Sequence, residues 1–284
     1  MECEFWLVST DHLKDRLWFK DNEDFKAGMN ISAQVAATYH MDVIAFILMS
    51  NHVHYVLSCS YSEAIAFIER FKRLYSQYYS GRYGSSELLR GNNVDIRQIY
   101  VGDESFERAV AYVQMNSVAA NICINASDYS WGTGNSFFKT EPARGVKLGS
   151  LSKRAVARIV HSRVQMPYDY LVGDNGVIVP ESYVNVKFVE DIFRSPKRMT
   201  YFLQNSSKAR NREALPSFDD QIILSAIKNL CVSMFRRQSF DALDDSQKQE
   251  VVKQVRYRFS ADPGQIARIT GLSYDEITQK LENY

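Results

Sequence analysis

The sequence predicts an α+β protein, with an antiparallel sheet and packed helices in the first half of the chain and mostly helices in the second. Short apolar segments alternate with helical segments up to about residue 123. A stretch rich in Gly, Ser and Thr follows at 128–153, and beyond it most segments look helical, apart from a possible small hairpin at 173–179. We therefore expect a first domain over residues 1–140 and a second over residues 151–284.

The elements of the first domain are predicted in the order strand, helix, strand, strand, helix, strand, helix. The run 42–49 is continuously apolar, as a central strand is, whereas 50–58 alternates. Glu23 and Asp24 suit the first turn of a helix. This order matches a ferredoxin-like αβ sandwich with an added helix. The strands are expected at 4–9, 42–49, 50–58 and 94–101, and the helices at 22–40, 62–81 and 104–123.

The composition is that of a folded globular protein, with 45% hydrophobic and 24% charged residues. The 34 Lys and Arg against 33 Asp and Glu give a net charge of +1, so a nucleic-acid surface must come from local patches. The cysteines are scattered without a CxxC pair, and no run approaches the roughly 18 apolar residues of a membrane helix. We expect a soluble, cytoplasmic protein with reduced thiols and no membrane partner.

Two histidines, His52 and His54, flank Val53 in the predicted strand 50–58. Side chains two apart on a strand point to the same face, so both imidazoles can meet one cation while Val53 enters the core. Such a pair also occurs in purely structural or surface roles. Its position in a strongly apolar strand favours a metal site.

Tyr112 and Asn116 are four residues apart in the predicted helix 104–123, a spacing that stacks two side chains on one helix face. Taken alone, the pair fits a partly buried tyrosine and a surface asparagine. Their order along the chain, after the histidine strand and a long aromatic helix, gives them a second interpretation.

Four segments in this order resemble the REP-associated tyrosine transposases, which belong to the HUH single-tyrosine nucleases. The family's usual strings are MPNHVH, a YxxYxN-like helix with a GxxG loop, YIxxNPVRA, and dYxWSS. Ser117 stands where the family usually has Pro, and Ala119 where it has Arg, which puts one DNA contact in doubt. The matching segments here are MSNHVH (49–54), FKRLYSQYYSGRYG (71–84), YVQMNSVAA (112–120) and DYSWGT (128–133).

The resemblance implies an HUH nuclease fold and a tyrosine transposase, that is, a DNA strand transferase and nickase. It implies that His52, His54 and Asn116 bind a divalent metal ion, Mg²⁺ or Mn²⁺, and that Tyr112 is the catalytic nucleophile. A phenol with a pKa near 10 needs a metal-polarised phosphate, positive charge or a base to react at neutral pH. The implied product is a 5′-phosphotyrosine, which a free 3′-hydroxyl can later resolve without ATP.

Basic and aromatic side chains are interleaved between residues 70 and 90, a mixture that suits DNA phosphates and unstacked bases. Some of these tyrosines must belong to the core, because they recur at helical spacing. The candidate DNA-binding residues are Arg70, Lys72, Arg73, Tyr79, Arg82 and Arg90.

The last segment, 262–284, resembles a helix-turn-helix in which Ser273 caps the second helix. Asp275 and Glu276 would repel DNA phosphates there. The core of the helix-turn-helix is expected to consist of Ile266, Ala267, Ile269, Leu272 and Ile277.

Basic segments occur in the second half of the chain at 153–160, 195–199, 207–212 and 235–239. They form either a track for DNA or solvated helix faces.

The function predicted from these patterns is metal-dependent cleavage and rejoining of single-stranded or hairpin DNA with palindromic repeats. One alternative is a non-catalytic, sequence-specific DNA-binding regulator that keeps the same fold. Another is a metal phosphohydrolase that uses water and needs no tyrosine. Either a monomer or a homodimer agrees with the sequence.

Overall fold

The computed structural model describes residues 4–84, 88–89, 91–162, 164–210 and 218–282. Its centre is a four-stranded sheet with the order β2-β3-β1-β4, in which every neighbouring pair is antiparallel. This is the strand order of a ferredoxin-like sheet, so the predicted fold class is confirmed. The strands are β1 (Phe5–Thr10), β2 (Asp42–Met49), β3 (His52–Ser58) and β4 (Val94–Ile99).

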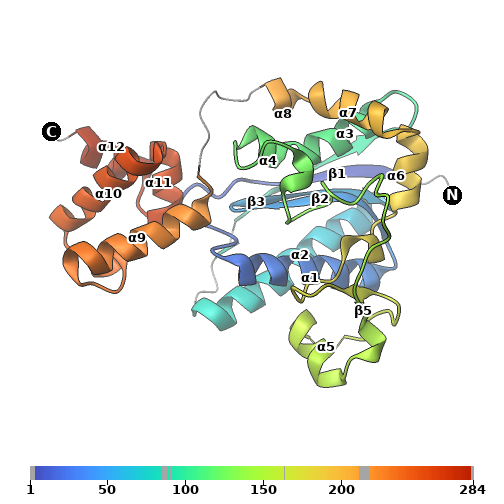
Figure 1. The fold of residues 1–284 in the computed structure, drawn as a ribbon, viewed down its shortest axis with the longest axis horizontal. Coiled ribbons are helices and arrows are strands. Elements are labelled where there is room, and N and C mark those ends of the chain that lie inside the picture. The colour runs from blue at the N-terminus through green and yellow to red at the C-terminus, as the bar shows by residue number, and fades with distance from the viewer. Residues whose placement is uncertain (1–3, 85–87, 90, 163, 211–217, 283–284) are drawn as a thin grey trace.

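Helices cover both faces of this sheet (Figure 1). Two long helices, α1 (Asn22–Tyr39) and α2 (Tyr61–Tyr83), pack on one face. The helix α3 (Ser105–Gln114) and the short α4 (Asn116–Ala119) lie on the other. The sheet therefore separates two hydrophobic cores, and a side chain on β3 points into one or the other according to its position in the alternation.

Polar caps fix the beginnings of the two long helices. The Asp21 side chain accepts hydrogen bonds from the first turn of α1, and Ser60 forms a capping box with Glu63 at the start of α2. Gly84 ends α2 in the left-handed conformation, with φ 71°, which glycine adopts without strain. The helix α2 thus begins one residue before the predicted start at Ser62 and ends two residues after the predicted end at Gly81.

The predicted helix 104–123 is divided in two by Met115. Its φ of −81° and ψ of 1° interrupt the helix between α3 and α4. The sequence around Met115 contains neither proline nor glycine, so nothing in it indicates the break. As a result Tyr112 belongs to α3, and Asn116 is the first residue of α4.

The DYSWGT segment covers the open edge of β2. The backbone carbonyl of Trp131 accepts from the Leu48 N–H at 2.8 Å, and the Tyr129 hydroxyl donates to the Leu48 carbonyl at 2.8 Å. A side chain at Gly132 would approach the Phe46 carbonyl to 2.6 Å, so this close contact requires glycine. The segment protects an edge strand and holds the end of β2 that leads into the histidine strand.

Residues 146–210 extend the two cores of the sheet. Leu148, Val160 and Ile178 join the core of α1 and α2, while Val189 and Phe202 join the core of α3. Figure 1 shows α7 and α8 lying beside α3 and α4, and α5 on the far side of α1. The elements between α4 and the last helices, with η for a 3₁₀ helix, are η1 (Ala126–Asp128), β5 (Val146–Lys147), η2 (Leu148–Ser150), α5 (Lys153–Val160), β6 (Leu171–Val172), η3 (Pro180–Ser182), α6 (Val186–Phe193), α7 (Pro196–Gln204) and α8 (Ser207–Arg210).

The last helices form a unit with its own hydrophobic core, drawn in orange and red in Figure 1. Its apolar side chains come from residues 223–277. This differs from the predicted division at residues 140–151, because the intervening segments pack on the sheet. We propose a boundary between residues 210 and 218 instead. The helices are α9 (Asp220–Phe235), η4 (Phe240–Ala242), α10 (Asp245–Phe259), α11 (Pro263–Thr270) and α12 (Tyr274–Glu282).

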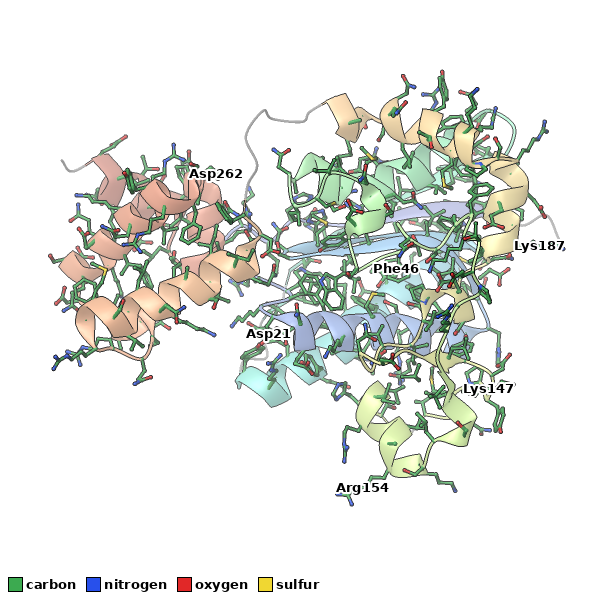
Figure 2. All side chains as sticks on the ribbon, in the orientation of Figure 1. Asp21, Phe46, Lys147, Arg154, Lys187 and Asp262 are labelled. Carbon is green, nitrogen blue, oxygen red and sulfur yellow. The ribbon has the colours of Figure 1, made fainter. Side chains whose placement is uncertain are left out.

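The two last helices agree with the predicted helix-turn-helix pattern. Ser273 accepts a hydrogen bond from the Glu276 N–H and so caps α12 as expected. The predicted core residues are buried, except that Leu272 is partly buried. Figure 2 shows Asp262 at the start of α11 in this unit, and Phe46 in the sheet. Among the described residues, no helix has the length and apolarity needed to cross a membrane.

Candidate active site

The two histidines of β3 point toward the layer of α3 and α4. Val53 and Tyr55 enter the core of α1 and α2, whereas Val56 enters the core of α3. His52 and His54 share the face of Val56 and are 4% and 2% exposed. Their ring centroids are 4.8 Å apart. The strand thus holds two buried imidazoles side by side.

Each of these histidines has one ring nitrogen with a partner and one without. Nδ1 of His52 lies 2.8 Å from Oδ1 of Asn51, and Nδ1 of His54 lies 2.8 Å from Oγ of Ser9. An amide oxygen only accepts, so Nδ1 of His52 donates and its Nε2 carries the lone pair. Both Nε2 atoms are buried and lack a hydrogen-bond partner within the described part of the chain. Buried polar atoms normally have a partner, so both are prepared for a ligand such as a metal ion.

A third histidine, His12, lies in the loop after β1. Its ring stacks on that of His52 with centroids 3.6 Å apart. The ligand atoms of His12, His52 and His54 all lie within 4.8 Å of one another, which suits a shared cation. Sequence reasoning missed His12, because a lone histidine far along the chain from the pair has no informative spacing.

Burial keeps the β3 histidines neutral at physiological pH. It lowers the pKa of His52 well below its usual range and that of His54 to about 3. The positive charge of Lys208 lowers both pKa values further, while the nearby Asn116 amide opposes the shift without completing a hydrogen bond to either Nε2. Neutral imidazole is the form that binds metals.

Tyr112 reaches the histidines from α3. Its half-buried ring stands edge-on to that of His54, with centroids 5.3 Å apart and planes at 78°. Burial raises the pKa of the phenol, and the charge of Arg97 only partly opposes this. The hydroxyl is therefore protonated at neutral pH and needs help to act as a nucleophile.

Asn116 lies at the break between α3 and α4, close to both histidines. Its Nδ2 donates to the carbonyls of Tyr112 at 2.8 Å and Val113 at 3.3 Å. The amide nitrogen is committed to the helix backbone, and the amide oxygen is the atom that remains for a cation. The structure thus brings together Tyr112, Asn116, His52 and His54, the four residues that the sequence singled out.

Lys208 of α8 also lies at this site, over the ring of Tyr112. Its Nζ lies 4.9 Å from the centroid of the Tyr112 ring. Sequence analysis noted 207–212 as a basic segment, but no pattern indicated that one of its lysines lies at the tyrosine. The packing of α7 and α8 on the α3 layer places it there.

A cleft of about 880 Å³ runs from the histidines to the helical unit. His12, Asn51 and His52 line it from the sheet domain. Arg256 and Arg268, from α10 and α11, line it from the helical unit. The site is thus open to a long substrate between the sheet domain and the last helices.

The candidate DNA-binding residues of α2 lie in the layer opposite to that of Tyr112. Arg73 is exposed and Arg70 half-buried, whereas Tyr79 is 4% exposed and packs against Tyr83. Lys72 donates to the Asn92 carbonyl at 2.6 Å. Arg90 lies outside the described residues.

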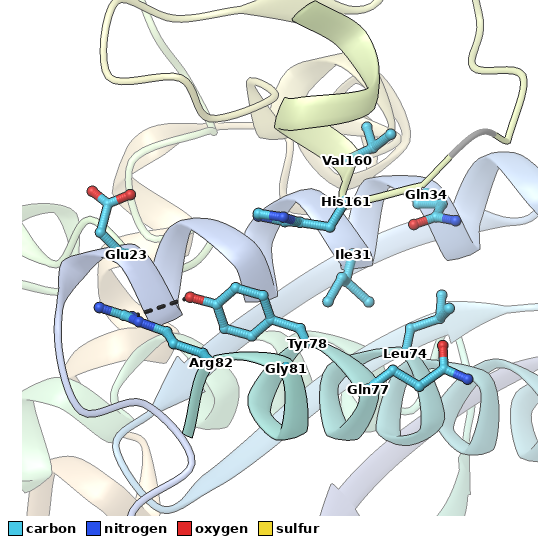
Figure 3. A pocket seen from close by; sticks show the side chains of 10 residues that line it. All are labelled: Glu23, Ile31, Gln34, Leu74, Gln77, Tyr78, Gly81, Arg82, Val160 and His161. Carbon is cyan, nitrogen blue, oxygen red and sulfur yellow. Dashed lines mark hydrogen bonds between the residues drawn. The ribbon is translucent and has the colours of Figure 1, made fainter. Parts of the chain in front are cut away.

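Arg82 is engaged by two carboxylates at the end of α2. It forms ion pairs with Asp21, at 2.7 Å, and with the buried Asp24. It also donates to the Tyr78 hydroxyl at 3.1 Å, beside a pocket under His161 (Figure 3). These contacts anchor α2 to the start of α1 and occupy the guanidinium.

No protein-family model matches the chain, and no curated protein matches it. One solved structure with a similar fold is titled "Structure of the REP associates tyrosine transposase bound to a REP hairpin". It is 14% identical, covers 61% of this chain and 87% of its own, and has a TM-score of 0.37. A likeness this distant transfers no residue's role, so the chemistry of the site rests on its own geometry.

Proposed function

We propose that this chain is a metal-dependent endonuclease and transesterase that cleaves and rejoins single-stranded, hairpin-forming repeat DNA through a 5′-phosphotyrosine. The observation that carries the proposal is the contact of Tyr112 with His54, which lies beside His52. Within the described residues the buried Nε2 atoms of both histidines lack hydrogen-bond partners. A nucleophile beside prepared metal ligands suits attack on a phosphodiester. This is the chemistry of a tyrosine transposase.

A divalent ion fits the site, because the Nε2 atoms of His52 and His54 lack partners among the described residues and the Asn116 side chain lies close to both, with His12 beside them. When bound, the ion would supply Lewis-acid polarisation of a phosphate oxygen. Both Mg²⁺ and Mn²⁺ are candidates. Because imidazole-rich sites favour transition ions, we expect Mn²⁺ to bind more tightly than Mg²⁺.

The proposed reaction uses the Tyr112 hydroxyl as the attacking group. A bond forms between its oxygen and phosphorus, and the bond from phosphorus to the 3′-oxygen breaks. The phenolic proton is released, the 3′-oxygen takes up a proton, and the 5′-phosphate remains on Tyr112. A second 3′-hydroxyl reverses these changes and joins the strands.

The cleft beside the histidines is the proposed path of the DNA strand. Arg256 and Arg268 line it and can contact backbone phosphates. Tyr257, at its rim, is 87% exposed and offers a ring on which a base can stack. We include Arg70 and Arg73 as outer contacts, because both side chains reach solvent. DNA binding by the other candidates, Lys72, Tyr79 and Arg82, would require these side chains to give up the contacts that they make within the protein.

The proposal is tested with a pool of single-stranded oligonucleotides that contains random sequences and the inverted repeats flanking the gene. The full chain is incubated with the pool and Mn²⁺, then denatured, and DNA that stays attached to protein is sequenced. We expect one family of hairpin sequences, each joined through its 5′ end. EDTA in a parallel sample should prevent attachment.

Two rival functions give different outcomes in the same experiment. Specific binding without attachment would favour a DNA-binding regulator, for which the helix-turn-helix pattern of α11 and α12 is the supporting observation. Strand cleavage without attachment would favour a phosphohydrolase that uses water.

A further inference from the structure

Lys208 is fixed in place by the docking of α7 and α8 on the α3 layer. Arg198 of α7 pairs with Glu107 of α3 at 2.8 Å. Ala209, next to Lys208, packs against a cluster that contains Met115 and Val118, the residues on either side of the start of α4. The same packing that positions Asn116 therefore positions Lys208.

The ammonium group of Lys208 is half-buried and faces the Tyr112 ring, 4.9 Å from its centroid. Among the ion pairs of the described residues, none involves Lys208. A cation removed from water is usually paired with a carboxylate, and within the part of the chain that the structure describes no carboxylate forms an ion pair with Lys208.

We propose that Lys208 is a catalytic residue that contacts the scissile phosphate and neutralises the charge that develops on it when Tyr112 attacks. The proposal rests on the proposed function. The phosphodiester carries one negative charge, and its non-bridging oxygens gain charge as the oxygen of Tyr112 approaches and the 3′-oxygen departs. A cation fixed beside the attacking group stabilises that state without reorganisation.

The role requires only that the ammonium is charged and lies beside the tyrosine. It also gives a reason for the position of a lysine in a partly apolar surrounding, since the phosphate of the bound substrate would provide a negative charge beside it. The segment after residue 150 then contributes a group to the active site, in addition to packing on the sheet.

The test compares two substrates with the DNA sequence captured by the unmutated chain. One has the natural phosphodiester at the cleavage position, and the other has a methylphosphonate, which removes one negative charge. The full chain is compared with Lys208→Met, Lys208→Arg and, as a matched control, Lys187→Met, because Lys187 is exposed on α6 and lies outside the basic segments. The rate of covalent attachment is measured for each, and thermal unfolding checks that the variants fold.

On the phosphodiester, we expect Lys208→Met to lower the attachment rate about 10²-fold, as loss of one electrostatic stabiliser does. Lys208→Arg should retain most of the rate, and Lys187→Met should not change it. On the methylphosphonate, Lys208→Met should react nearly as fast as the unmutated chain, because there is less charge to neutralise.

An equal loss on both substrates would overturn the proposal and make Lys208 a packing residue for Tyr112. An undiminished rate on the phosphodiester would overturn it as well. Failure of the proposed function is recognised separately, because the unmutated chain would then form no adduct with either substrate.

Discussion

The Ser50 hydroxyl donates a 2.6 Å hydrogen bond to Oδ2 of Asp220, joining the turn before the histidine strand to the first residue of α9. Asp220 is buried and also accepts hydrogen bonds from Gln265, at 2.9 Å, and from Arg268. One carboxylate thus connects the histidine end of β3 with α11.

We predict that Asp220→Ala loosens the helical unit from the sheet domain. Loss of hydrogen bonds to a charged group costs about 1.5–3 kcal/mol each when the partners stay buried, and less for the partly exposed Arg268. Limited proteolysis should cut the variant faster between residues 204 and 219. Asp191→Ala is the control, because Asp191 is exposed on α6. Equal cleavage of both variants would show that the carboxylate does not hold the two parts together.

We predict that Ser9→Ala weakens metal binding although Ser9 touches no metal. Its hydroxyl holds Nδ1 of His54, and loss of such an outer contact typically costs about 10- to 100-fold in metal affinity. Calorimetric titration with Mn²⁺ measures the change. Ser58→Ala, at the opposite end of β3, should bind as the unmutated chain does. An unchanged Mn²⁺ affinity in the Ser9→Ala variant would show that Ser9 does not orient His54 for metal binding.

We predict that His12 and His52 respond differently to excess metal. His12 is exposed on a loop, so water can replace it as a ligand, whereas His52 is buried and hydrogen-bonded to Asn51. His12→Ala should therefore recover DNA attachment at high Mn²⁺, and His52→Ala should not. The measurement is the rate of attachment as a function of Mn²⁺ concentration. Recovery of both variants, or of neither, would contradict this division.

We predict that residues 1–217 fold and attach to DNA, whereas residues 1–150 do not fold. Val189, Phe193 and Phe202 complete the core of α3, so the shorter chain exposes that core. Circular dichroism measures folding.

Removing α9–α12 should weaken hairpin binding and reduce its salt dependence, because Arg256 and Arg268 are lost. Unchanged hairpin selection by residues 1–217 would place target recognition in the sheet domain.

The sequence was sufficient for the elements whose signals are local. The apolar run of β2, the alternation in β3, the acidic first turn of α1 and the Ser273 cap of α12 are each contained in a few neighbouring positions, and the structure has these elements within two residues of the predicted bounds. The spacing of His52 and His54 likewise required only the geometry of a strand.

The features that sequence reasoning missed depend on packing between distant segments. His12 and Lys208 enter the site because a loop and a short helix dock beside β3 and α3. The stretch 128–153 has the composition of a linker, yet Trp131 and Thr133 bond to β2. Composition does not distinguish a free loop from one that pairs with a strand edge.

Mass spectrometry of the protein–DNA adduct after protease and nuclease digestion identifies the residue that is joined to DNA. We predict that the unmutated chain yields a peptide in which Tyr112 carries a 5′-linked nucleotide, and that Tyr112→Phe yields none while still binding the DNA. A nucleotide on any other residue, or an adduct that persists in Tyr112→Phe, would contradict the account.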